Sequence, residues 1–189
     1  MTRFWPACVV AAMTLAIWPA QAQDKPKLIP DRDVDLTYRV TDGSGALAQQ
    51  RVRWLAAKHL LRREDPGTGF TLVDRKTDYI TIVNTRTKSY VKVEEPAGGL
   101  FRIDSAGLVT KGGGATVAKL PCTEWSWVDT STQQPRTVCA TDDGVMLRVT
   151  EVGRTLIEAI SITYRKVNPK TFAVPMGYEP TLIPDTSGQ

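Results

Sequence analysis

The side chains that most often carry catalysis are sparse and unfavourably spaced in this sequence. His59 is the only histidine, which excludes a metal site built on several histidines. Ser44 lacks the GxSxG pattern of a nucleophile elbow, and the glycines at 112–114 lack the Lys-Ser/Thr of a phosphate loop. The adjacent carboxylates Glu94–Glu95 and Asp142–Asp143 would point to opposite faces of a strand. We therefore expect a protein that is not an enzyme and uses no metal or cofactor, although a glycosidase pair of carboxylates distant in sequence remains open.

The cysteines predict one disulfide. Cys8 lies in the apolar N-terminal stretch, which leaves Cys122 and Cys139 as an even pair in the rest of the chain. They enclose 16 residues with a polar centre at 129–135, so a bridge would join two neighbouring strands. Such a bridge stabilises a fold by roughly 3 kcal/mol. The alternative is a redox or metal-binding pair, but the chain has no CxxC pattern.

Aromatic side chains are the main candidates for contact with a ligand. Tyr38, Trp54, Trp125 and Trp127 fall in segments with the pattern of strands, and the last two share one face. Two interpretations are open. The rings fill a core, or they line the inside of a curved sheet that holds an apolar ligand.

The segment 96–109 interrupts the strand pattern and is a candidate cover over the open side of the sheet. It carries the apolar residues Leu100, Phe101, Ile103 and Leu108. Glycines at 98–99 and 112–114 bracket it. We count Leu100 and Phe101 among the candidate ligand contacts, and an ordinary plug for one end of the sheet is the alternative.

A basic cluster is the candidate for a charged partner. It consists of Arg51, Arg53, Lys58, Arg62 and Arg63. It is either a solvated sheet face or a surface for anionic lipid headgroups or an acidic partner.

Strands must position these residues, because the dominant hydrophobic period is two. We expect roughly nine to eleven of them, nearly all in meander order. The predicted strands are 33–40, 51–54, 58–63, 70–74, 79–84, 89–93, 115–120, 123–128, 136–140, 145–150 and 155–167. No amphipathic helix separates consecutive strands, so the expected fold is mainly β: a single curved, half-open antiparallel sheet with little helical cover.

The alternation also predicts which side chains face the core. We expect burial of Val34, Leu36, Tyr38, Val52, Trp54, Leu147, Ile160 and Ile162. We expect exposure of Arg51, Arg53 and Arg148.

The ends of the chain suggest export. A single early charge at Arg3, the apolar stretch 8–18 and Ala20-Gln-Ala22 are typical of a signal peptide, 1–22, cleaved near Ala22. The single β domain is then 23–178, followed by a flexible tail at 179–189. The expected location is periplasmic or secreted.

The composition is that of a folded globular chain. Its 189 residues are 42% hydrophobic and 23% charged, which argues against disorder, collagen and a multi-span membrane protein. Loss of Arg3 with the signal peptide lowers the formal charge from +4 to +3. That mild basicity does not imply nucleic acid as a partner.

The C-terminal half carries distinctive sequence motifs. They are Cys122-Thr-Glu-Trp125, the run 138–148 (VCATDDGVMLR), Glu158-Ala159 with Tyr164, and Phe172-Ala-Val-Pro-Met-Gly-Tyr178. They resemble uncharacterised exported bacterial proteins and, more broadly, the LolA/LolB-like periplasmic lipoprotein-carrier superfamily. That resemblance covers 34–178 and implies a curved, half-open sheet with helical cover, which in some members carries lipoprotein acyl chains. Scant helical cover and the predicted disulfide set this chain apart, so no lipid-contacting residue is transferred.

The expected function is that of an exported, non-enzymatic binder or carrier of a lipid or other apolar ligand at the cell envelope. The alternative is a structural or protein-interaction module of the periplasm with a filled core and no ligand. An open apolar trough would favour the first, and a filled concave face would favour the second.

Overall fold

The computed structural model describes residues 25–41, 43–95, 103 and 106–181. Its elements are β1 (Val34–Thr41), β2 (Leu47–Leu55), η1 (Ala56–Lys58), β3 (Leu60–Asp65), β4 (Gly69–Asp74), β5 (Tyr79–Asn84), β6 (Ser89–Glu94), β7 (Thr110–Val117), β8 (Leu120–Asp129), β9 (Gln134–Ala140), β10 (Met146–Glu151), β11 (Arg154–Tyr164), η2 (Pro169–Phe172) and β12 (Glu179–Pro180). The predicted signal peptide, 1–22, lies outside the described residues. No helix among the described residues is long and apolar enough to cross a membrane.

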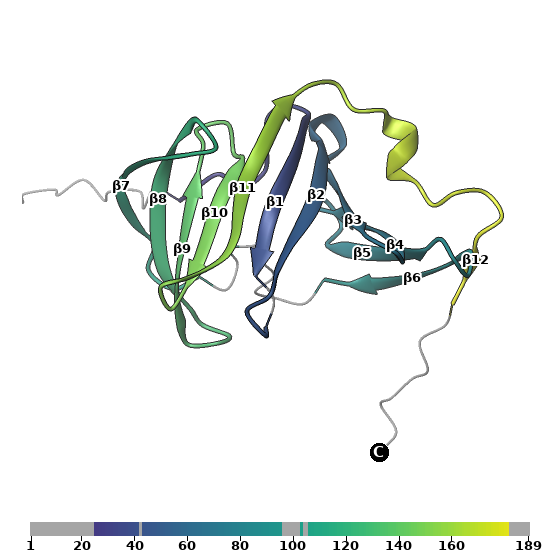
Figure 1. The fold of residues 1–189 in the computed structure, drawn as a ribbon, viewed down its shortest axis with the longest axis horizontal. Coiled ribbons are helices and arrows are strands. Elements are labelled where there is room, and N and C mark those ends of the chain that lie inside the picture. Colours follow the sequence, from purple (N-terminus) through teal and green to yellow (C-terminus); the bar gives the residue numbers. More distant parts are fainter. Residues whose placement is uncertain (1–24, 42, 96–102, 104–105, 182–189) are drawn as a thin grey trace, which may run out of the picture.

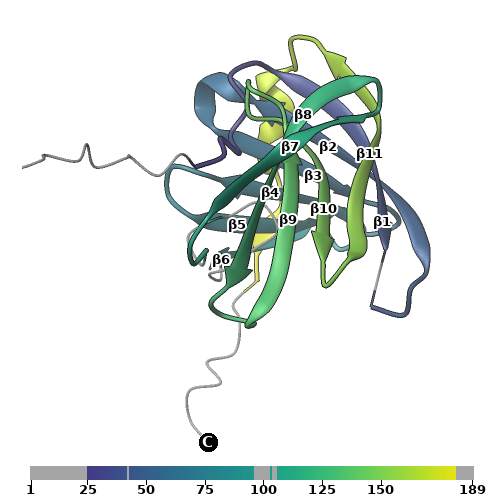
Figure 2. The ribbon, with the colours of Figure 1, turned by 90° about the vertical axis from the view of Figure 1, so that its left-hand side faces the viewer.

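The strands form one open sheet in the order β12-β6-β5-β4-β3-β2-β1-β11-β10-β9-β8-β7 (Figure 1). Neighbours are antiparallel except β12 and β6. β1 lies in the middle, with hairpins leading outward from it to β6 and back from the other edge, β7, to β11. Figure 2 shows the sheet curving around its inner face. The expected mainly β, half-open antiparallel sheet is confirmed.

Two hydrophobic clusters lie on opposite faces of this sheet. The larger one fills the inner face and includes Leu36, Trp54 and Leu147. The smaller one packs Phe70 and Val83 against the C-terminal segment. Strand β4 is therefore buried on both faces, which explains its nearly continuous apolar run.

The end of the chain is fixed to this second cluster. Phe172 is buried and Val174 is half-buried against it. Arg62 holds the same segment, because its guanidinium lies 3.4 Å from the centroid of the Phe70 ring and donates to the Thr171 carbonyl at 2.6 Å. The first residues of the predicted tail, Glu179 and Pro180, form β12 beside β6.

The face prediction is wrong at Ile160. Its seven companions are buried or, for Ile162, half-buried, whereas Ile160 is 36% exposed. The cause is a β-bulge in β11: Thr37 pairs with Ser161 and Tyr38 with Ala159, which leaves Ile160 as the extra residue. An extra residue reverses which face the following side chains occupy.

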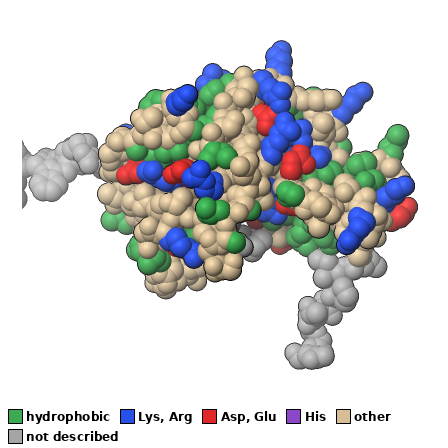
Figure 3. Space-filling view, in the orientation of Figure 1, with side chains coloured by type: hydrophobic (Ala, Val, Ile, Leu, Met, Phe, Trp, Pro, Cys, Tyr) green, Lys and Arg blue, Asp and Glu red, His purple; other side chains and the backbone are tan. Residues whose placement is uncertain are grey.

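The expected exposure of the arginines holds only in part. Arg51 is 45% exposed, but the side chains of Arg53 and Arg148 are only 16% and 28% exposed. The reason is cross-strand pairing, since Arg53 pairs with Glu64 and Arg148 with Glu124. Figure 3 shows acidic and basic side chains alternating in a row across this outer face.

The predicted disulfide is present between Cys122 and Cys139, whose Cα atoms are 5.5 Å apart. It joins β8 to β9, and both cysteines are buried. We expect thiol labelling of the unreduced, denatured protein to modify neither cysteine, and labelling after reduction to modify both. Modification of both before reduction would contradict the bridge.

Candidate functional site

The predicted aromatic contacts lie together inside the main core. Tyr38, Trp54, Trp125 and Trp127 are all buried and belong to one cluster on the inner face. The Tyr38 hydroxyl donates to the Met146 carbonyl at 2.6 Å, and burial raises the pKa of this phenol. The structure therefore places these four rings in tight packing rather than on an open surface. The other two predicted contacts, Leu100 and Phe101, fall outside the described residues.

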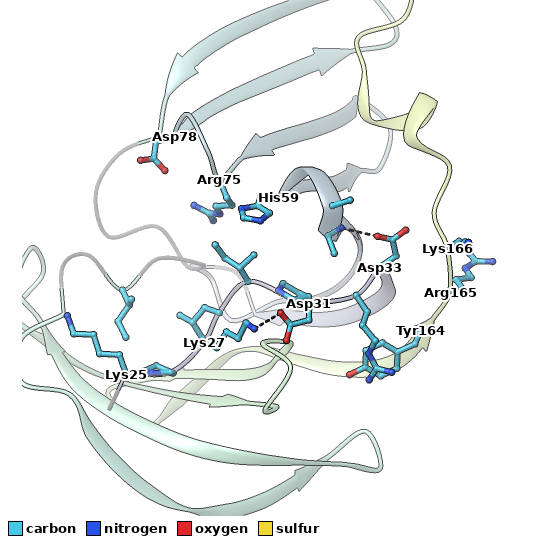
Figure 4. A pocket seen from close by; sticks show the side chains of 18 of the residues that line it. Lys25, Lys27, Asp31, Asp33, His59, Arg75, Asp78, Tyr164, Arg165 and Lys166 are labelled. Carbon is cyan, nitrogen blue, oxygen red and sulfur yellow. Dashed lines mark hydrogen bonds and ion pairs between the residues drawn. The ribbon is translucent and has the colours of Figure 1, made fainter. Parts of the chain in front are cut away.

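A large pocket opens beside this core, between the N-terminal segment and η1 (Figure 4). Its volume is about 1330 Å³. The apolar part of its lining consists of Pro26, Leu28, Ile29, Pro30, Ala56, Ala57, Ile103 and Ala106. Charged residues complete it: Lys25, Lys27, Asp31, Arg32, Asp33, Arg75, Asp78, Arg165 and Lys166, with His59 and Tyr164 beside them.

The N-terminal segment, 25–33, forms one wall as an extended chain outside the sheet. Pro26, Leu28 and Pro30 are buried, whereas Lys25 and Lys27 are exposed. This alternation is that of a strand, but the prolines have no N–H to offer to a ladder. The segment therefore packs on the core through side chains and needs other anchors.

The turn between β9 and β10 supplies these anchors. Asp31 N–H donates to the Asp143 carbonyl at 2.9 Å, and the Arg32 guanidinium donates to the Asp143 carboxylate at 3.0 Å. Gly144 has φ +90°, and a Cβ there would lie 2.3 Å from the Ile29 carbonyl oxygen. The segment thus lies directly on the backbone of this turn.

The carboxylate of Asp143 is kept charged at this junction. Partial burial would raise its pKa, but hydrogen bonds from Thr141, Arg32 and Tyr164 outweigh burial and lower it. Tyr164 donates at 3.2 Å, and its ring lies under the Arg32 guanidinium, 3.8 Å from its centroid. Asp143 therefore ties the N-terminal wall to the end of β11.

Asp33 connects η1 with the chain segment that follows β11. Its carboxylate accepts from Ala56 N–H at 2.9 Å and from Val167 N–H at 3.1 Å. η1 and the chain that leaves β11 are thereby held side by side. The helix ends at Lys58, and the next residue, His59, adopts φ +56° where a strand was predicted from residue 58.

A third carboxylate lies behind the pocket rim, on the outer face of β1. Hydrogen bonding from Arg51, with a further contribution from Arg165, lowers the pKa of Asp35 to about 2 against the opposing effect of burial. Arg51 donates at 2.6 Å, and Arg165 pairs with the same oxygen. The Arg165 guanidinium is thus held beside Asp35 on the outer face of β1.

The predicted basic cluster does not form one free surface. Each of its arginines pairs with a carboxylate: Arg51 with Asp35, Arg53 and Arg62 with Glu64, and Arg63 with Asp65. Only Lys58 of that cluster has no carboxylate within ion-pair distance among the described residues. These pairs account for the arginines as parts of the sheet.

Sequence reasoning missed the residues that build the pocket. Asp142-Asp143-Gly144 has the pattern of a hairpin turn, and nothing local shows that it also holds residues 29–32. The alternation in the predicted strand 33–40 places Asp33 on the outward, polar face of that strand. Among the described residues, no group of three His, Cys, Asp or Glu side chains could hold a metal ion.

No family model matches the chain, and no curated protein matches its sequence. Its fold is similar to that of an uncharacterized conserved protein from Thermus thermophilus, at 13% identity and a TM-score of 0.57, over 80% of this chain and 90% of that one. It is also similar to MucB, a periplasmic protein with a LolA-like fold, at 9% identity and a TM-score of 0.52. A structure of MucB in complex with MucA(peri) gives 11% identity and a TM-score of 0.50.

These similarities concern the fold. The matches span 79% of this chain in both MucB structures but only 59% and 56% of the MucB chains. The chain therefore corresponds to little more than half of MucB. The similarity to MucB supports the expected resemblance at the level of the fold alone.

Proposed function

We propose that this protein is an exported, non-enzymatic binder of an acyl chain or other apolar ligand at the cell envelope. The ligand occupies the pocket between residues 25–33 and η1. The observation that carries the proposal is this pocket, of about 1330 Å³, which is lined in part by apolar residues. Ligand pockets usually measure about 300–1,000 Å³, so the space suits a long chain.

Export is supported by three independent features. The first residues have the pattern of a signal peptide, and the cysteines form a bridge of the kind that persists in oxidising compartments. The fold is similar to that of periplasmic MucB. A periplasmic location is therefore part of the proposal.

Filling the pocket should abolish binding while the fold persists. Ala57 is exposed, lies in η1 and lines the pocket, so Ala57→Trp places an indole in the ligand's space. We expect a fluorescent acyl probe to bind the mature protein, and this variant to bind it at least about tenfold more weakly. The measurement is a fluorescence titration.

Ala46→Trp is the matched control. Ala46 is also exposed but lies in the turn before β2, away from the pocket lining. It should bind the probe as the parent protein does. If no acyl probe binds the parent at tens of micromolar, or if both variants bind equally well, the pocket is not the site.

A protein-interaction module is the second candidate. It is favoured by the filled inner core and by the edge strand β7, whose residues 110–114 are exposed. One of the similar structures is itself a complex, of MucB with MucA(peri). An open edge strand offers unpaired backbone groups to an extended segment of a partner. Failure of every acyl probe would favour this candidate.

A further inference from the structure

We infer that the ligand is an amphiphile whose headgroup is an anion, held by cations at an end of the pocket while its tail lies against the apolar side chains that line it. This inference rests on the proposed function. It specifies the chemical class of the ligand, which the apolar side chains alone leave open.

The exposed charges of the pocket are mostly positive. Its exposed cations are Lys25, Lys27, Arg32, Arg165 and Lys166. Its exposed acids are Asp31 and Asp78. Lys27 pairs with Asp31, and the other exposed cations leave an excess of positive charge that attracts an anion.

Arg32 and Arg165 still present positive charge to solvent, although each pairs with a carboxylate. The side chains of Arg32 and Arg165 are 60% and 55% exposed, whereas those of Asp143 and Asp35 are 23% and 9% exposed. The acids lie behind, where hydrogen bonds occupy them, and the guanidinium groups face solvent. Because a guanidinium carries five N–H donors, each still has donors for a phosphate or carboxylate.

Two lysines of the pocket lie outside the ion pairs that the described residues form. Among the described residues, neither Lys25 nor Lys166 has a carboxylate within ion-pair distance. Figure 4 places Lys25 at one end of the pocket and Lys166 at the other. Replacing them should therefore remove positive charge from both ends of the pocket without breaking an ion pair among the described residues.

Competition by amphiphiles of equal tail length tests the headgroup directly. Decyl phosphate, decanol and decyltrimethylammonium would each displace the bound acyl probe from the mature protein. We expect decyl phosphate to act at a concentration at least about tenfold below that of decanol, and decyltrimethylammonium to be the weakest. Salt should reduce the advantage of the phosphate, because the rim charges are exposed.

The double variant Lys25→Gln/Lys166→Gln should reduce the preference for decyl phosphate over decanol roughly fivefold, and leave decanol unchanged. Lys119→Gln/Lys170→Gln removes the same charge from exposed positions outside the pocket and should change nothing.

Equal displacement by all three compounds, or an equal loss in both double variants, would overturn the anionic headgroup while leaving an acyl site in place. Full displacement by inorganic phosphate alone would overturn the amphiphile. Absence of probe binding to the parent would instead refute the proposed function.

Discussion

Replacing Asp129 by Leu should destabilise the protein by about 3–5 kcal/mol, as expected for a broken buried ion pair. Asp129 is fully buried at the end of β8 and pairs with Arg136 at 3.2 Å. It also accepts hydrogen bonds from the backbone and hydroxyl of Ser131. Removing the carboxylate takes away one acidic partner of the buried Arg136 guanidinium, which also pairs with Glu151 at 2.8 Å. Equilibrium unfolding in urea would measure the loss.

Two companion variants test that explanation. Glu158→Ala removes an acid whose partners, Arg39 and Arg148, lie 3.8 Å away on the outer face, and should cost less than about 1 kcal/mol. Adding Arg136→Met to Asp129→Leu should recover part of the lost stability, because it removes the buried guanidinium whose charge the Asp129 carboxylate no longer compensates. If Asp129→Leu were no more harmful than Glu158→Ala, the buried pair would not hold this end of the sheet.

The strands could be predicted because their signal is local. Strands β4, β5 and β6 begin and end within one residue of the predicted limits, since alternation and turn residues lie within each segment. The disulfide followed from cysteine count and compartment. Asp129 shows the limit of such reasoning, because it lies in a polar stretch that suggested an exposed loop. Its burial depends on Arg136 in the next strand.

The pocket could not be predicted, because its walls come from distant parts of the chain. Residues 25–33, η1 and the end of β11 are joined by Asp33 and Asp143, whose partners lie up to 134 positions away. The exposed Ile160 likewise depends on a bulge that leaves no mark in the alternation of β11. The predicted aromatic site followed from residue type. Residue type alone cannot distinguish aromatic rings that line a cavity from aromatic rings that fill a core.

Substitution of Gly144 tests whether the N-terminal segment, 25–33, is required as a wall of the pocket. Gly144→Ala should destabilise the protein by roughly 2–5 kcal/mol, combining about 1–2 for a left-handed backbone with a side chain and 1–3 for overpacking. The new methyl would meet the Ile29 carbonyl oxygen at 2.3 Å, and this atom is backbone, so the segment must move. Displacement of residues 25–33 removes one pocket wall. We therefore expect acyl-probe affinity to fall at least about tenfold.

Gly153→Ala is the control that separates these effects. Gly153 has φ +75° in the turn before β11, and a Cβ there would meet nothing within 4 Å. Gly153→Ala should lose only the stability that a side chain costs at a left-handed backbone position, and it should bind the probe normally.

Trypsin provides a second measurement, because the bond after Lys27 precedes the buried Leu28. Cleavage at that bond should accelerate in Gly144→Ala and not in Gly153→Ala, since only the first displaces the wall. If the two variants matched in cleavage and in binding, the contact with Ile29 would not position the wall, and the pocket would have to be held by Asp33 and Asp143 alone.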